Sequence, residues 1–263
     1  MGLNAEAKNV FENEDKIKQE VSKLNEMIWE ELYRVIRTTY KKLPYHNFSH
    51  AEEVACNCLE ILGRINKSKL NNEDFDYPTI QKLLYLAALL HDAGHGYYST
   101  KEDEENSAIL AEKLLKEYEY SPKEIDYVKK LILATTFGDR KKIHEEWSII
   151  EKVIADADIA NSLGGPFKDH LRNEIQVLME WNPPHEIITL DKVLKLPKSK
   201  EWFMEFLKRV TGGNVFLLKE TKELFPYSEE NLIQLKNLSE EKLKKAFEEE
   251  WEKFYWYEFV FVK

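Results

Sequence analysis

Three short motifs in the first 160 residues are rich in histidine, in aspartate or in both. They are HNFSH at residues 46–50, HDAGH at residues 91–95 and DAD at residues 156–158. Imidazole and carboxylate groups together are the ligands preferred by hard or borderline divalent metals. The motifs therefore predict a divalent-metal site, provided that the elements carrying them meet at one place.

The position expected for Asp92 strengthens this prediction. Residues 83–90 are almost entirely apolar, which predicts a helix buried at the centre of a bundle. An ionised Asp92 at its end would be costly unless it is paired or bound to a metal. An isolated His91-Asp92 pair is usually explained by a hydrogen bond between its members and a helix cap. Here the neighbouring histidines and aspartates favour the metal.

Helical spacing of apolar residues recurs along the chain. It predicts helices over about residues 14–40, 49–65, 106–119, 122–135 and 147–160, and a further helix that starts near Pro78 and is ended by Gly94 and Gly96. Ser49-His50-Ala51-Glu52 and Ser121-Pro122-Lys123-Glu124 fit the capping-box pattern, in which serine and glutamate each satisfy a free backbone N–H. Pro78 suits the first turn of its helix.

The C-terminal third predicts further helices, over residues 202–210 and 239–254. Residues 255–262 could form a short strand or a docked tail. The alternation of strand and helix typical of a parallel sheet is missing. We therefore expect an all-α fold that forms one bundle. Its parts are an N-terminal helical segment (1–40), a metal-binding core (41–170) and C-terminal helices completing the same domain (171–263).

Composition restricts the class of protein. The chain has 263 residues and a formal net charge of −10, which disfavours binding to duplex nucleic acid or an anionic membrane. A phosphorylated substrate remains compatible, because a metal supplies local positive charge. The two cysteines, Cys56 and Cys58, point in different directions on a helix and predict neither a disulfide nor a zinc site. Few cysteines, no export signal and no bilayer-length apolar run predict a cytoplasmic protein.

The order His50, His91-Asp92 and a distal aspartate resembles the metal-binding order of the HD phosphohydrolase superfamily. The motifs at 46–50 and 91–95 are similar to those of class I cyclic nucleotide phosphodiesterases and of bacterial predicted HD phosphohydrolases. This resemblance covers roughly residues 40–170. It implies one or two divalent ions per chain (Mn, Mg, Fe, Co or Zn), held by His50, His91, Asp92 and the distal aspartate.

Two aspartates compete for the distal position. Ala157-Asp158-Ile159-Ala160-Asn161 matches the superfamily pattern better, so the resemblance assigns Asp158 as the ligand. Asp156 would lie about 200° away around a helix, so both are not expected to face one ion. Asp156 remains the second candidate, or a cap or supporting residue.

The resemblance also implies catalytic roles. His46 would be the general acid, since histidine titrates near neutrality and can protonate a leaving oxygen. His95 would order water or a second ion, although a local hydrogen bond at a helix end is an equal alternative. Glu104 would orient a water or a histidine, although an acidic helix start explains it as well. His144 could contact phosphate but reads better as a solvated loop residue. The remaining histidines, His170 and His185, carry no supporting pattern.

These roles predict attack of metal-bound hydroxide on a phosphoester of a small, nucleotide-type substrate, either a diester or a monoester. Cyclic-nucleotide specificity is in doubt because residues 212–216 contain no glutamine to hold a purine. A di-iron oxygenase and a non-catalytic nucleotide-binding regulator are the alternatives from other classes. An aromatic cluster could be a lid or a homodimer surface, although core packing is the commoner explanation; it comprises Trp251, Phe254, Tyr255 and Trp256.

Overall fold

The computed structural model describes residues 26–71, 73–95, 103–136, 146–180 and 216–237, with single positions between 239 and 249. These residues form helices and no β-strand, so the predicted all-α class is confirmed. None of their helices is long and apolar enough to cross a membrane. The predictions for residues 202–210 and for the aromatic tail lie outside this part of the chain.

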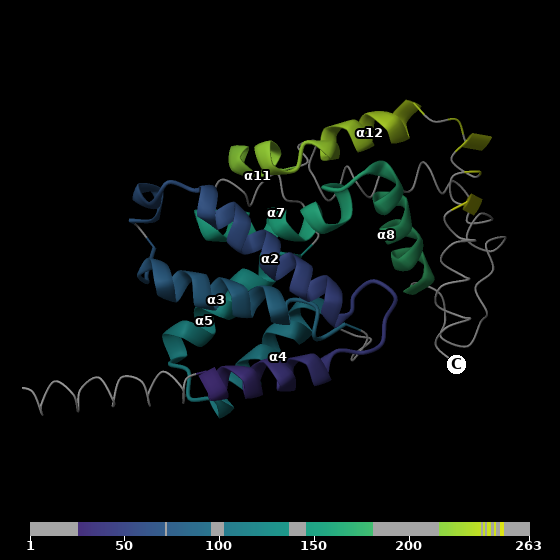
Figure 1. The fold of residues 1–263 in the computed structure, drawn as a ribbon. Coiled ribbons are helices and arrows are strands. Elements are labelled where there is room, and N and C mark those ends of the chain that lie inside the picture. The colour runs from purple at the N-terminus through teal and green to yellow at the C-terminus, as the bar shows by residue number, and fades with distance from the viewer. Residues whose placement is uncertain are drawn as a thin grey trace, which may run out of the picture. The chain divides into compact units, whose positions relative to one another are not determined.

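The chain divides into two compact units, Met1–Thr39 and Tyr40–Lys263. In the first unit, residues 26–39 are helical. All the site residues lie in the second unit, whose elements are drawn in Figure 1.

Three helices form the centre of the second unit. Helix α2 (Phe48–Arg64) packs against both α3 (Tyr77–Leu90) and α7 (Ile149–Leu163) (Figure 1). Helix α3 is buried along most of its length, as its continuous apolar sequence predicts. Its last residue, Leu90, leads directly into His91-Asp92, so the polar pair emerges inside the bundle.

The other helices surround this centre. The short 3₁₀ helix η1 (Lys67–Leu70) links α2 to α3, and α4 (Asp103–Glu117) packs on α5 (Pro122–Leu133), which also contacts α3. Helix α8 (Phe167–Glu180) packs on α7. Helices α11 (Lys219–Leu224) and α12 (Tyr227–Asn237) also contact α7, and α12 contacts α8 as well (Figure 1).

Helix capping matches the sequence prediction at one end and departs from it at another. The capping box of Ser121 and Glu124 is present, and an equivalent one that we did not predict joins Ser148 and Glu151 at the start of α7. The predicted box at Ser49 is wrong. Asn47 is the cap instead, and its side chain accepts from the backbone N–H of Ser49 and of His50. Helix α2 therefore starts at Phe48, one residue before the predicted start, and His50 is its third residue.

The turn after α3 lies directly against the start of α4. The backbone N–H of Gly94 donates to Ser107 Oγ at 2.8 Å. A Cβ atom on Gly94 would lie only 2.3 Å from the backbone nitrogen of Ser107. This close approach requires glycine, because the contacting atom is backbone and cannot rotate away.

We expect Gly94→Ala to lower the free energy of unfolding by roughly 1–3 kcal/mol, as overpacking does in dense interiors. Gly63→Ala is the matched control, because nothing lies within 4 Å of its Cβ position on exposed α2 surface. The control should raise the free energy of unfolding by roughly 0.5–1 kcal/mol through helix propensity. Urea unfolding measures both, and equal effects would contradict the close approach.

A polar cluster is buried where α7 meets α8. Ser162 Oγ donates to Glu174 Oε1 at 3.1 Å, and His170 Nδ1 lies 3.1 Å from the carbonyl oxygen of Ser162. Burial raises the pKa of Glu174 to about 8 and lowers the pKa of His170 to about 4. Both side chains are therefore neutral in the folded protein at pH 7.

Glu174→Gln should stabilise the protein more at pH 8 than at pH 5. Between about 4.5, its ordinary pKa, and about 8, the folded chain binds a proton that the unfolded chain has released. Wild-type stability therefore falls as pH rises through this window, and glutamine removes that loss. We expect the difference between variant and wild type to grow by roughly 2 kcal/mol or more.

Urea unfolding at the two pH values measures this growth. Glu230→Gln, on exposed α12 surface, is the control and should show no such growth. A pH-independent difference for Glu174→Gln would mean that the buried carboxyl is ionised at pH 5.

Candidate metal centre

Three segments that are distant in sequence place the predicted residues in one region. His46 lies just before α2, and His50 lies in its first turn. His91 and Asp92 follow α3 directly, and Asp158 lies in the middle of α7. Packing of α2 against α3 and α7 therefore brings all three sequence motifs together.

The first group of converging ligand atoms is His50, His91 and Asp158, with Asp92 beside them. The Nε2 atoms of His50 and His91 lie 3.2 and 2.9 Å from Asp92 Oδ2. The same atoms lie 3.3 and 3.5 Å from Asp158 Oδ1. These side chains are at most 9% exposed. We call this group the inner cluster.

The second nitrogen of each histidine fixes which atom can bind a metal. His50 Nδ1 lies 2.9 Å from Asn161 Oδ1, and His91 Nδ1 lies 2.8 Å from the Ala88 carbonyl oxygen. Both partners only accept, so each Nδ1 carries a proton. In the neutral rings, both Nε2 lone pairs therefore point toward the carboxylates.

Lone pairs that face one another repel unless a cation lies between them. Three buried atoms of the inner cluster have no hydrogen-bond partner among the described residues: His50 Nε2, His91 Nε2 and Asp92 Oδ2. Burial lowers the pKa of His50, but the adjacent carboxylates of Asp158 and Asp92 outweigh it and raise this pKa to about 9. The centre thus attracts positive charge, and the donor set fits a divalent metal.

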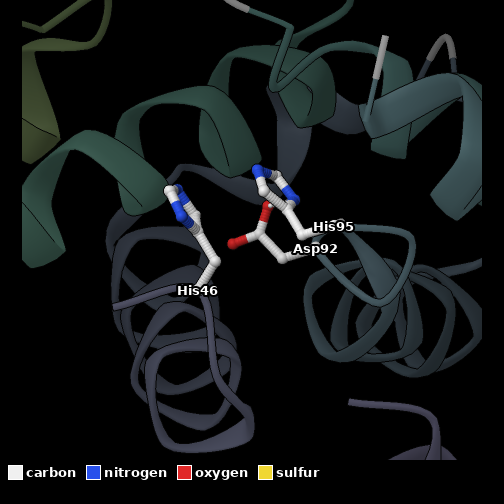
Figure 2. A group of neighbouring side chains, drawn as sticks. All are labelled: His46, Asp92 and His95. Carbon is white, nitrogen blue, oxygen red and sulfur yellow. Dashed lines mark ion pairs between the residues drawn. The ribbon is translucent and has the colours of Figure 1, made fainter. Parts of the chain in front are cut away.

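A second group of possible ligands, the outer cluster, consists of His46, Asp92 and His95 (Figure 2). Figure 2 shows the Asp92 carboxylate beside the two histidine rings. His95 Nδ1 lies 3.2 Å from Asp92 Oδ1, and the His46 and His95 rings stack with centroids 4.1 Å apart. Asp92 therefore serves both clusters, one with each oxygen.

Glu180, at the end of α8, holds His46 and was missed by the sequence analysis. Its Oε1 accepts from the backbone N–H groups of Tyr45 and His46, and its Oε2 contacts His46 Nδ1. Burial lowers the pKa of His46, but Asp92 and Glu180 outweigh it and raise this pKa. No local pattern marks Glu180, because its partner lies 134 residues earlier.

Glu104 belongs to neither cluster but lies near both. It is 8% exposed in the first turn of α4. Burial, together with the charges of Asp92 and Asp158, raises its pKa to about 7. Neighbouring Asp103 faces His95, with Oδ2 3.6 Å from His95 Nε2.

The two candidate distal aspartates have separate positions. Asp158 faces the inner cluster, whereas Asp156 is fully buried and accepts from the backbone N–H groups of Leu217 and Leu218 at 2.8 and 2.9 Å. Asp156 therefore anchors the segment that leads into α11. Among the other histidines, His170 belongs to neither cluster, and His144 and His185 lie outside the described residues.

Residues 47–162 match the family model of the HD domain. This segment is an HD domain. The match confirms the predicted superfamily, that of the HD-domain metal-dependent phosphohydrolases, and it spans the inner cluster entirely. A comparison with curated proteins finds no match. HD domains bind divalent metals, and most proteins that contain one are metal-dependent hydrolases.

The two aspartates offer a matched test of the inner cluster. We expect Asp158→Asn to weaken Mn²⁺ binding by more than about 100-fold, since even supporting residues cost 10- to 100-fold. Asp156→Asn should keep metal affinity and lose about 1–3 kcal/mol of stability, because it removes one of two buried charge-assisted hydrogen bonds and leaves the other without the charge. Calorimetric titration and urea unfolding give the two readouts. Loss of metal in the Asp156 variant alone would reverse the assignment.

Proposed function

We propose that this chain is a metal-dependent phosphohydrolase that cleaves a phosphoester of a small, nucleotide-type substrate. The observation that carries the proposal is the convergence of two histidine lone pairs and two carboxylates in the inner cluster of an HD domain. A divalent ion bound there would polarise a phosphoryl oxygen and lower the pKa of bound water.

The exposure of the two clusters favours separate roles. In the inner cluster, the His50 and His91 side chains are only 3% and 1% exposed. In the outer cluster, the His46 and His95 side chains are 14% and 17% exposed. Substrate therefore approaches from the side of His46 and His95, and the inner cluster holds its ion away from solvent.

Hydrolysis forms a bond from a water oxygen to phosphorus and breaks the bond from phosphorus to the leaving oxygen. The leaving oxygen needs a proton, which His46 is placed to donate from Nε2, because Glu180 engages its Nδ1. His95 stacks on His46 and contacts Asp92 and Asp103, so it orients this side of the site. Buried Glu104 would orient the attacking water.

The acidity of the chain supports a small substrate over a duplex nucleic acid. The formal net charge is −10, and a polyanion would be repelled along its length. A single phosphate group needs positive charge at one point only, which a bound ion provides. Among phosphorylated compounds, the resemblance of the motifs favours nucleotides.

His46→Gln should lower phosphoesterase activity by about 10²–10⁴-fold while Mn²⁺ stays bound, because it removes the proton donor but none of the inner ligands. Glu180→Gln should cost roughly 10- to 100-fold by releasing the His46 ring. The assay uses Mn²⁺-loaded protein with bis-p-nitrophenyl phosphate and p-nitrophenyl phosphate, which also separates diesterase from monoesterase activity.

Glu112→Gln is the matched control for Glu180→Gln, since Glu112 pairs with Lys116 and Lys129 on the surface of α4. It should leave activity unchanged. Metal-loaded wild-type protein that hydrolyses neither ester would contradict the proposal. Oxygen uptake by the iron-loaded protein would support an oxygenase instead.

A further inference from the structure

Asn161 joins a ligand of the inner cluster to a surface carboxylate. It lies on α7 one turn after Asp158, and its Oδ1 is 2.9 Å from His50 Nδ1. Its Nδ2 donates to Glu53 Oε2 on α2. The hydroxyl of Tyr45 donates to the same Oδ1 at 3.3 Å.

Helix geometry explains why these groups meet. His50 and Glu53 are three residues apart on α2, and Asp158 and Asn161 are three residues apart on α7, so each pair shares a helix face. The two faces oppose each other where α2 packs on α7. His50 therefore contacts Asp158 with one ring nitrogen and Asn161 with the other.

The partners of Asn161 determine the orientation of its amide. Glu53, when ionised, can only accept, so it requires the NH₂ end of the amide. The Tyr45 hydroxyl donates to the other end, which leaves Oδ1 facing His50. An amide turned the opposite way would present NH₂ to both Tyr45 and His50 and its oxygen to the Glu53 carboxylate.

We propose that Asn161 is a positioning residue that keeps the proton of His50 on Nδ1 and so presents Nε2 to the metal, with Glu53 holding the amide in place. The inference rests on the proposed metal site and adds the group that prepares one of its ligands. Ring nitrogens opposite a metal commonly donate to a fixed acceptor, which sets the tautomer and the ring orientation. In the inner cluster, the Ala88 carbonyl has this role for His91.

Two residues of the hydrogen-bonded chain from His50 through Asn161 to Glu53 lie near the surface. Glu53 and Asn161 line a cavity of about 370 Å³ between α2 and α7. Glu53 itself is exposed, so a smaller side chain there leaves no buried void. The hydrogen bond between Asn161 and Glu53 can therefore be removed by a surface substitution that leaves the packed core intact.

The test measures Zn²⁺ affinity by competition with a chelator, because Zn²⁺ is diamagnetic and also permits NMR. Asn161→Leu should weaken Zn²⁺ binding by roughly 10- to 100-fold. In Zn²⁺-loaded wild-type protein labelled with ¹⁵N-histidine, the Nδ1 proton of His50 should exchange slowly with water. This signal should be lost in Asn161→Leu. Asn57→Leu is the control, since Asn57 also bonds from α2 to α7 but reaches the Ala157 carbonyl.

Three further variants separate positioning from folding. Glu53→Ala should weaken Zn²⁺ binding several-fold, whereas Glu52→Ala removes the same charge from the same cavity and should not. The double variant Asn161→Asp with Glu53→Gln exchanges donor and acceptor, because aspartate accepts from both His50 and the new glutamine. It should restore the Zn²⁺ affinity lost in Asn161→Leu.

The outcomes distinguish this inference from the proposed function. Wild-type protein that fails to bind Zn²⁺ would overturn the metal site itself, and the positioning role with it. Wild-type protein that binds Zn²⁺, together with unchanged affinity and an unchanged His50 signal in Asn161→Leu, would overturn only the role of Asn161. If Asn161→Leu does not fold, equal affinities of Glu53→Ala and Glu52→Ala overturn it.

Discussion

The carboxylate of Asp92 is the group on which the rest of the second unit depends. It is 5% exposed at the end of the most apolar helix, and each oxygen faces a different cluster. A charge in that position is tolerable only if cationic or donor groups surround it. The histidines of both clusters and the dense turn at Gly94 are arranged around this requirement.

Several local features of the sequence help to position the residues around Asp92. Asn47 starts α2 early enough to place His50 in the first turn, opposite α7. Asp156 and Asp158 divide two tasks on one helix, since one side holds the segment before α11 and the other completes the inner cluster. The residues of the inner cluster are closed off from solvent, whereas His46 and His95 lie nearer to it.

Helical periodicity was sufficient to predict the all-α class and the buried α3, whereas the resemblance of the motifs to the superfamily named the residues of the inner cluster. Periodicity also predicted that Asp156 and Asp158 would not share an ion, but only tertiary packing shows which way each points. Glu180 could not be predicted, because a single glutamate at the end of an amphipathic helix has no local signature. Asn47 and Ser49 are both good caps, and the choice between them depends on how the chain enters α2.

The inner cluster draws its atoms from the beginning of α2, the end of α3 and the middle of α7. An ion held there would cross-link three helices. In terms of chain entropy, this is equivalent to closing two long loops. The unfolded chain cannot present these atoms together, so binding free energy adds directly to folding free energy. With such an ion, the lifetime of the folded HD domain depends on the supply of free metal around it.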